Sequence, residues 1–228
     1  MVDDGNIDAM AQNLKNDLRV KQIWAGEHFF GRSGWQAGQP LGEPDTADEY
    51  TRCISYWVCC AVTTESADPK AGPYYRNNLE WTLTHLKDRI NSGIKYMDKH
   101  PEQLRSPLNL VTPDDNTVFH RAVKGAAPET LQLLLTHRAE RTMPNLNVKA
   151  KGITALGLLL RIGLDTDKQV ACFWVLINHM LTHNYCDDSC PIPLFAFREM
   201  KQNPAKFASF RETVARKSAE LKAEGWTA

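Results

Sequence analysis

The sequence predicts an all-α fold, in which a helical N-terminal half stacks on repeated helix pairs that a last helix covers. Apolar residues recur at three- and four-residue steps along most of the chain, which is the period of an amphipathic helix. No stretch of useful length alternates as a half-buried strand does. A pattern that opens with threonine occurs at Thr117 and again 37 positions later at Thr154, a spacing typical of helical repeat proteins.

The N-terminal region, residues 1–105, is expected to contain three helices. The first covers residues 6–24 and the second covers residues 47–63. The third runs over residues 75–99 and ends before Pro101, because a proline ring disfavours the helix that precedes it. The side chains expected to face inward in the last two helices are Tyr50, Ile54, Trp57, Val58 and Ala61, then Leu79, Leu83, Leu86, Ile90, Ile94 and Met97.

A long loop is expected between residues 26 and 44, because seven glycines and prolines punctuate this stretch. The loop also contains His28, Phe29, Phe30 and Trp35. So many aromatic rings indicate that it packs on the body of the protein rather than acting as a free linker. Neither the loop nor the rest of the N-terminal half carries a motif that assigns it a function.

Residues 106–202 carry the repeated pattern. In the first copy, Thr117 begins a short helix that Gly125 closes, and a leucine-rich second helix follows. In the second copy, Thr154 begins the short helix, Gly163 ends it, and the second helix is longer. Each copy is therefore expected to form a pair of helices that packs against the next pair.

Further elements complete this part of the chain. Hairpin-like loops are expected before the two copies, at residues 108–116 and 146–153. A third and more divergent copy begins at Ile192. Asn203-Pro204 then opens a last helix whose charged outer face suits a cap, so residues 203–228 form a C-terminal capping region.

These copies resemble the ankyrin repeat, whose unit has a hairpin, a Thr-Pro-Leu-His-x-Ala opening, a glycine turn and a leucine-rich second helix. The first copy has Val118-Phe119 in place of Pro-Leu and Arg138 in place of a glycine, and it matches at Thr117, His120, Ala122, Gly125, Leu133, Leu134 and Ala139. The second copy has Gly157 in place of the histidine, and it matches at Thr154, Leu156 and Gly163. The third copy matches at Pro193 and Leu194.

The resemblance implies a short solenoid that binds another protein. In the family, the opening histidine forms hydrogen bonds with the neighbouring repeat, which would be the role of His120. Hairpin tips and first helices line the concave side, where the partner docks. At those places we expect partner-binding residues, with an exposed Leu158 as the apolar centre, at Asp114, Asp115, Arg121, Lys124, Lys149, Lys151, Leu158 and Arg161.

Charge balance disfavours a general nucleic-acid binder. Lysine plus arginine and aspartate plus glutamate number 27 each, whereas such binders carry a basic excess. The balance hides an asymmetry, because residues 116–228 contain 15 basic and 10 acidic side chains. An acidic partner therefore suits the repeat half better than a basic one.

The remaining composition predicts a soluble cytoplasmic protein. No apolar run approaches the roughly 18 residues of a membrane span. The first residues are acidic and polar, so no secretory signal or mitochondrial presequence is visible. Six cysteines in 228 residues do not make a disulfide scaffold. The divergent repeats beside an unrelated helical half also resemble bacterial or viral ankyrin effectors, which would place the protein inside a host cell.

Two sites with possible chemistry were weighed against simple packing. His179, His183, Cys186 and Cys190 have zinc-ligand residue types, but their spacing is crowded and falls where a helix passes into its loop. We expect no metal there, although the sequence leaves zinc open. Cys53, Cys59 and Cys60 lie in an apolar helix, with His85 and His120 as the only basic partners to consider. Nothing in the sequence activates these thiols, so no catalytic residue and no cofactor are expected.

The preferred function is therefore a non-enzymatic, ankyrin-type module that docks a protein partner on its concave face. One alternative is an enzyme whose N-terminal helical half holds the active site while the repeats recruit the substrate. Another is a subunit of a constitutive complex, which would show a larger apolar face.

Overall fold

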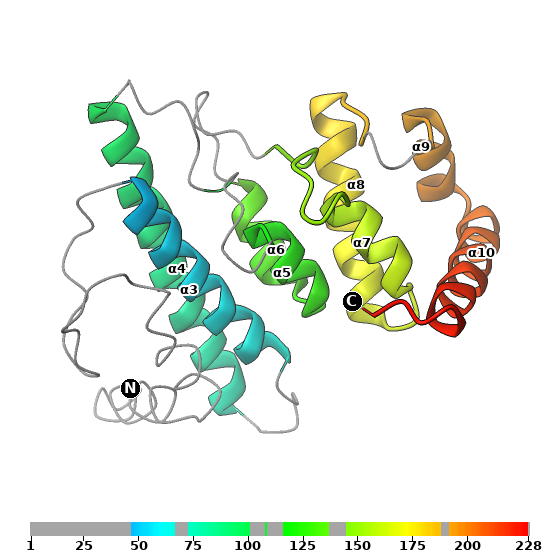
Figure 1. The fold of residues 1–228 in the computed structure, drawn as a ribbon, viewed down its shortest axis with the longest axis horizontal. Coiled ribbons are helices and arrows are strands. Elements are labelled where there is room, and N and C mark those ends of the chain that lie inside the picture. The colour runs from blue at the N-terminus through cyan, green and yellow to red at the C-terminus, as the bar shows by residue number, and fades with distance from the viewer. Residues whose placement is uncertain are drawn as a thin grey trace. The chain divides into compact units, whose positions relative to one another are not determined.

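A computed structural model of the protein describes residues 47–66, 73–100, 108, 116–136, 145–187 and 192–227. The chain divides into two compact units, residues 1–107 and 108–228. Regular structure in the described part is helical, apart from one isolated bridge between Ala150 and Ile153 (Figure 1). The prediction of an all-α chain is confirmed for these residues. The expected first helix, residues 6–24, and the aromatic loop that follows it lie outside them.

The described part of the first unit is a pair of helices, α3 (Ala47–Ser66) and α4 (Pro73–Lys99), which pack against each other. Trp57 of α3 lies against Trp81 of α4, with ring centroids 5.5 Å apart. The inward-facing residues predicted for this pair are confirmed as buried at Ile54, Trp57, Val58, Ala61, Leu79, Leu86 and Ile90. Leu83 and Ile94 are half-buried.

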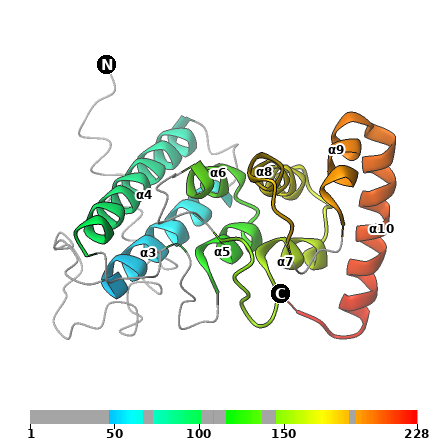
Figure 2. The ribbon, with the colours of Figure 1, turned by 90° about the horizontal axis from the view of Figure 1, so that it is seen from above.

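The second unit begins with two helix pairs. The first pair is α5 (Val118–Lys124) and α6 (Pro128–Thr136), and the second is α7 (Ala155–Ile162) and α8 (Asp167–His183). Within each pair the helices contact each other, and α5 also contacts α7 while α6 contacts α8. Figure 2 shows the two short helices beside each other and the two second helices beside each other. The short helix predicted to begin at Thr117 and to be closed by Gly125 is observed as α5, with these two residues as its caps.

Threonine hydroxyls fix where three of these helices begin. Thr117, Thr154 and Thr166 each accept a hydrogen bond from the backbone N–H three residues later, which satisfies a donor left over at the first turn. At Thr166 the arrangement is a reciprocal capping box, because the Gln169 side chain accepts from the Thr166 backbone N–H. Gly163, with φ of 116°, ends α7 in a conformation that side chains rarely adopt.

Two further helices, α9 (Leu194–Gln202) and α10 (Pro204–Ala223), complete the second unit. Helix α9 contacts α8, and α10 contacts both α9 and α7. The junction is aromatic: Phe173 of α8 lies 6.0 Å from Phe197 of α9 and 5.4 Å from Phe210 of α10, measured between ring centroids. The predicted last helix is confirmed, and it packs as part of the second unit.

Helix α10 also supplies hydrogen bonds to the end of α7. The Arg211 guanidinium donates two to the Leu164 carbonyl, at 3.1 and 2.8 Å, and the Ser218 hydroxyl donates one to the Ile162 carbonyl at 2.8 Å. The last carbonyls of a helix, such as that of Ile162, have no hydrogen-bond partner within the helix. The Ser218 hydroxyl supplies that partner in place of water, and Arg211 does the same for the Leu164 carbonyl just after α7. Helix α10 is therefore held by directional hydrogen bonds as well as by apolar contacts.

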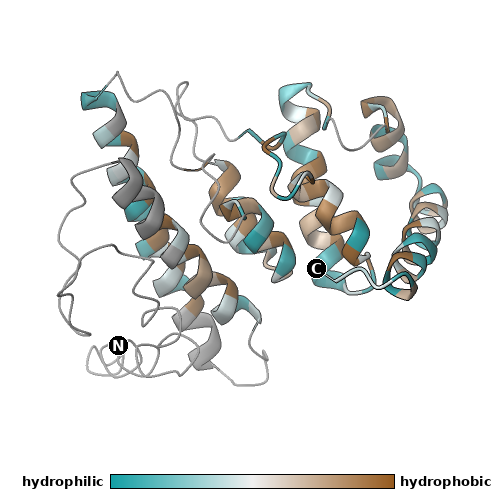
Figure 3. Cartoon of the chain, in the orientation of Figure 1, coloured by the Kyte–Doolittle hydropathy of each residue, from teal (hydrophilic) through white to brown (hydrophobic). Residues whose placement is uncertain are grey.

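The burial of Leu158 overturns one prediction from the sequence. Leu158 was expected to be exposed, but it is buried, with 8% of its surface accessible. Its helix is mostly apolar (Figure 3) and contacts α5, α8 and α10. Those neighbours cover the face on which Leu158 lies, which leaves Arg161 as the exposed residue of α7. Leu158 belongs to the core and is no longer a candidate contact for a partner.

Replacing Leu158 should therefore affect stability. We expect Leu158→Ala to lower the free energy of unfolding by about 2–4 kcal/mol, because it removes buried methyl groups and leaves a cavity. Urea denaturation followed by circular dichroism measures this, with the exposed Lys149→Ala as a control that should change stability by less than about 0.5 kcal/mol. Equal stability of the two variants would show that Leu158 is not in the core.

Candidate functional site

A buried histidine joins the two helix pairs of the second unit. The His120 Nε2 atom lies 2.8 Å from the Ile153 carbonyl oxygen, and Nδ1 lies 2.7 Å from the Thr117 hydroxyl. A carbonyl oxygen only accepts, so Nε2 carries the ring proton and Nδ1 accepts from the threonine hydroxyl. The same hydroxyl accepts from the His120 backbone N–H at 3.3 Å. The ring thus connects the beginning of α5 to the residue that precedes the cap of α7.

A second polar link repeats this arrangement with different residues. The Thr154 hydroxyl accepts from the Gly157 backbone N–H at 3.1 Å and donates to Asp187 Oδ1 at 3.0 Å. Gly157 stands three residues after Thr154, where His120 stands after Thr117. No imidazole is present at this position, and the Asp187 carboxylate accepts the hydrogen bond of the Thr154 hydroxyl. Asp187 is buried, with 2% of its surface accessible. Both links join residues 33 positions apart, His120 to Ile153 and Thr154 to Asp187.

Burial holds His120 in its neutral form. Desolvation lowers the pKa of the ring below its ordinary value of 6.5, while the hydrogen bond to Ile153 and the charge of Asp187 oppose that shift. Both ring nitrogens are engaged and the side chain is 2% exposed. An acid–base catalyst needs a ring nitrogen within reach of a substrate. His120 therefore links elements of the fold, because its ring joins α5 to the residue before the cap of α7.

The eight residues predicted to bind a partner fall into distinct environments. Lys124, Lys149, Lys151 and Arg161 are exposed, and Arg121 is half-buried. Leu158 is buried, as described above. Asp114 and Asp115 lie outside the described residues. The four exposed cations form what we call the basic surface, Lys124, Lys149, Lys151 and Arg161.

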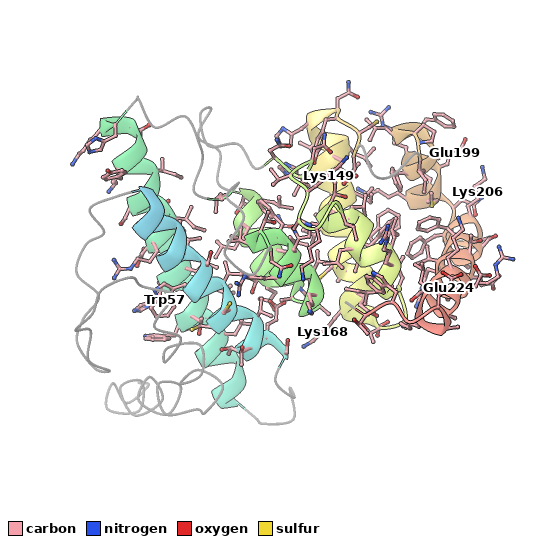
Figure 4. All side chains as sticks on the ribbon, viewed as in Figure 1. Trp57, Lys149, Lys168, Glu199, Lys206 and Glu224 are labelled. Atoms are coloured by element: carbon pink, nitrogen blue, oxygen red, sulfur yellow. The ribbon has the colours of Figure 1, made fainter. Side chains whose placement is uncertain are left out.

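Two of these cations sit on a tight turn before α7. The backbone groups of Ala150 and Ile153 exchange two hydrogen bonds, 2.9 and 3.1 Å long, across Lys151 and Gly152. Lys151 and Gly152 have φ of 52° and 77°, as in the two-residue hairpin turns that require positive φ. Ala150 is buried, so the exposed Lys149 and Lys151 flank an inward-facing residue. Figure 4 labels Lys149 in this segment.

The other two cations occupy matching places on neighbouring helices. Lys124 and Arg161 lie seven residues after the capping threonines Thr117 and Thr154, in the last turns of α5 and α7. These helices contact each other, so the two cations stand at equivalent positions on adjacent helices. A cation in a last turn also interacts favourably with the helix dipole, so part of its effect is on the helix itself.

The residues with metal-ligand chemistry are only partly described. His179 and His183 are half-buried and share one face of α8, with ring centroids 4.4 Å apart, while Cys186 is exposed and Cys190 lies outside the described residues. The two histidines line a cavity of about 340 Å³ between α6 and α8, together with Gln132, Leu135, Thr136, Val175, Asn178 and Thr182. Within the described part of the chain no group of three or more histidine, cysteine or acidic side chains could hold a metal ion.

The thiols considered as nucleophiles lie in an apolar setting. Cys60 is buried in α3 and Cys59 is half-buried, while the Cys53 side chain is outside the described set. His85 of α4 stacks on Trp81, with ring centroids 4.2 Å apart, and its Nδ1 donates to the Trp81 carbonyl at 3.1 Å. This ring is oriented by its own helix, so it is not held as a base against a cysteine.

Two contributors to the second unit were missed in the sequence. Asp187 lies in a loop without a motif, and only its distance of 33 residues from Thr154 could have indicated it. Arg211 was counted with the solvated face of the last helix, yet it caps the Leu164 carbonyl. Neither interaction has a local signal, because each partner lies far away in the chain.

Comparisons of the chain with protein-family models, curated proteins and solved structures found no match. A search of the described helices found none with the length and apolar character needed to cross a membrane.

The His120 link generates a prediction about pH. Because the folded-state pKa of His120 is lowered, the unfolded state binds more protons below about pH 6.5 and stability should fall as the pH decreases. The decrease should stop once the pH passes the lowered pKa, and its slope should not exceed about 1.4 kcal/mol per pH unit.

His120→Gln should remove this component, because glutamine does not titrate. Urea unfolding of both proteins between pH 4.5 and 8 measures the difference, so the contributions of other histidines cancel. If the two proteins show parallel stability profiles across that range, His120 does not titrate as argued.

Proposed function

We propose that the chain is a non-enzymatic, ankyrin-type binding module of the cytoplasm, whose second unit docks a protein partner on the basic surface. One observation carries the proposal. Exposed cations recur at equivalent positions of the adjacent helices α5 and α7, and buried hydrogen bonds at His120 and Thr154 fix how these helices are held. Such an arrangement suits recognition, because it presents charged groups on a rigid scaffold.

Support for a repeat architecture comes from the helix pairs of the second unit. The short helices α5 and α7 begin at equivalent capping threonines and contact each other, as do the second helices α6 and α8. The tight turn at residues 150–153 stands before α7 as a hairpin would. The 33-residue separation of both polar links equals the unit length of ankyrin repeats.

Support for docking rather than catalysis comes from the chemistry of the surface. Lys124, Lys149, Lys151 and Arg161 are exposed, and the α5 histidine, His120, is buried and engaged through both nitrogens. With Leu158 in the core, the surface has no large apolar centre. The partner is therefore recognised through charge more than through a hydrophobic pocket, which favours fast and salt-sensitive association.

The proposal predicts that charge reversal at the helix-end cations removes partner binding. The double variant Lys124→Glu/Arg161→Glu should lose the partner that the wild type captures in cross-linked cells, because opposite charges are replaced by like charges. Thermal stability should fall modestly, by about 1 kcal/mol per site at most, since both positions are exposed but each glutamate also faces the negative end of its helix.

The matched control is Lys217→Glu/Lys222→Glu, which makes the same charge change on exposed positions of α10. Quantitative mass spectrometry of captured proteins compares the three forms. The proposal stands if a protein is lost with the first variant and retained with the control. It fails if both variants capture what the wild type captures.

A further inference from the structure

Two histidines one helical turn apart line the cavity between α6 and α8. His179 and His183 stand at positions i and i+4 of α8, so their side chains lie on one face of the helix. Both residues are half-buried, and their ring centroids are 4.4 Å apart with 48° between the ring planes. The Tyr185 ring lies edge-on to His179 at 6.5 Å. The wall of the cavity therefore contains two imidazoles in contact with each other.

The rest of the cavity wall decides which ligand chemistry suits this pair. Amide, hydroxyl and aliphatic groups make up the remainder, from Gln132, Leu135, Thr136, Val175, Asn178 and Thr182. The residues that line the cavity include no carboxylate. Hard cations such as Mg²⁺ and Ca²⁺ need oxygen ligands, and carboxylates above all. Imidazole nitrogen suits Cu²⁺, Ni²⁺ and Zn²⁺ instead.

The separation of the two rings matches the coordination of one ion. Imidazole nitrogens bind these metals at about 2.0–2.1 Å, which places each ring centroid roughly 3.2 Å from the metal. Two rings at the right angle of a square-planar site would have centroids about 4.5 Å apart, against about 5.2 Å at the tetrahedral angle. The observed 4.4 Å agrees with the right angle. Square-planar coordination is typical of Cu²⁺, which also binds most tightly among the divalent first-row metals.

We propose that His179 and His183 chelate one Cu²⁺ ion at the cavity between α6 and α8. Each ring supplies one nitrogen. A ligand histidine commonly uses its other nitrogen for a hydrogen bond, so a further interaction of either ring is compatible with binding. The site needs neither Cys186 nor Cys190, and it shares no residue with the basic surface.

Water completes the coordination of the ion. In the part of the chain that the structure describes, no third histidine, cysteine or acidic side chain joins the pair to hold a metal. The cavity has a volume of about 340 Å³, whereas one water occupies about 30 Å³ in the liquid. Waters on the metal therefore have room, and the amides and hydroxyls of the wall are available to orient them.

One positive charge opposes the ion. The Lys201 ammonium donates to Asn178 Oδ1 at 2.7 Å, which places it beside a residue of the cavity wall. Lys201 is exposed, so salt screens its repulsion over a Debye length of about 8 Å. With two protein ligands and a cation nearby, the site should bind its metal reversibly. A structural site with four protein ligands would instead contribute to folding.

Titration of the metal-free full chain with Cu²⁺ alone tests the proposal. Isothermal titration calorimetry measures the affinity, and the electron paramagnetic resonance spectrum of bound Cu²⁺ counts its imidazole nitrogens. The wild type should bind one tight equivalent through two such nitrogens. His179→Ala and His183→Ala should each bind about tenfold to a hundredfold more weakly, because two ligands on one rigid face act together.

The matched control keeps the number of histidines and changes only their spacing. Asn178→His/His179→Asn places the two imidazoles five residues apart, on different faces of α8, and should bind as weakly as the single variants. Circular dichroism of each variant checks that the helices are retained. The wild-type spectrum tests the coordination without any substitution, so the proposal does not depend on the folding of a variant.

Three results would overturn the proposal. A single imidazole nitrogen in the wild-type spectrum would exclude the chelate. Equal affinity of the wild type and the spacing variant would place the ion at other histidines of the chain. Binding of inorganic phosphate that requires both histidines, in a protein that does not bind Cu²⁺ there, would make the cavity an anion site.

Discussion

The second unit depends on polar groups buried between its helix pairs. An apolar core alone would hold α5 against α7, but apolar contacts have no direction and tolerate sliding. The His120 ring must meet both Thr117 and the Ile153 carbonyl, since an unpaired buried polar group costs about 1–3 kcal/mol. A shift of α5 along α7 would break the hydrogen bond between the ring and the Ile153 carbonyl. The link therefore sets which residues of neighbouring helices stand beside each other.

The two polar links are also coupled electrostatically. Asp187 accepts from Thr154 and its charge opposes the lowering of the His120 pKa. Burial still dominates, so the ring remains neutral and keeps the tautomer that donates to Ile153. The Asp187 carboxylate thus accepts the hydrogen bond of Thr154, where Gly157 offers no side chain. Its charge does not raise the pKa of His120 enough to make the ring charged. Asp187 is thus the partner of Thr154, as the His120 ring is the partner of Thr117.

Much of the fold could be predicted from the sequence because its signals are local. Threonine caps, Pro128 and Pro204 mark helix beginnings, Gly163 marks an end, and the apolar steps mark inward faces. Leu158 was misjudged because its helix contacts α5, α8 and α10, whose packing on α7 is set by residues distant in the chain. Asp187 and Arg211 were missed for the same reason, since their partners are fixed by packing rather than by neighbouring residues. The exposed cations were found because lysine and arginine on turns and at helix ends are usually exposed.

The position of Lys124 and Arg161 in last helical turns shapes how they can act. The carbonyls at a helix C-terminus carry partial negative charge, which attracts each cation and repels an approaching carboxylate. An incoming anion is therefore attracted only at the ends of these long side chains, away from the helix backbone. Attraction at such exposed places is screened by salt over a Debye length of about 8 Å at physiological ionic strength. A partner held there gains rapid encounter and charge selectivity, whereas tight binding would require further contacts beyond these two helices.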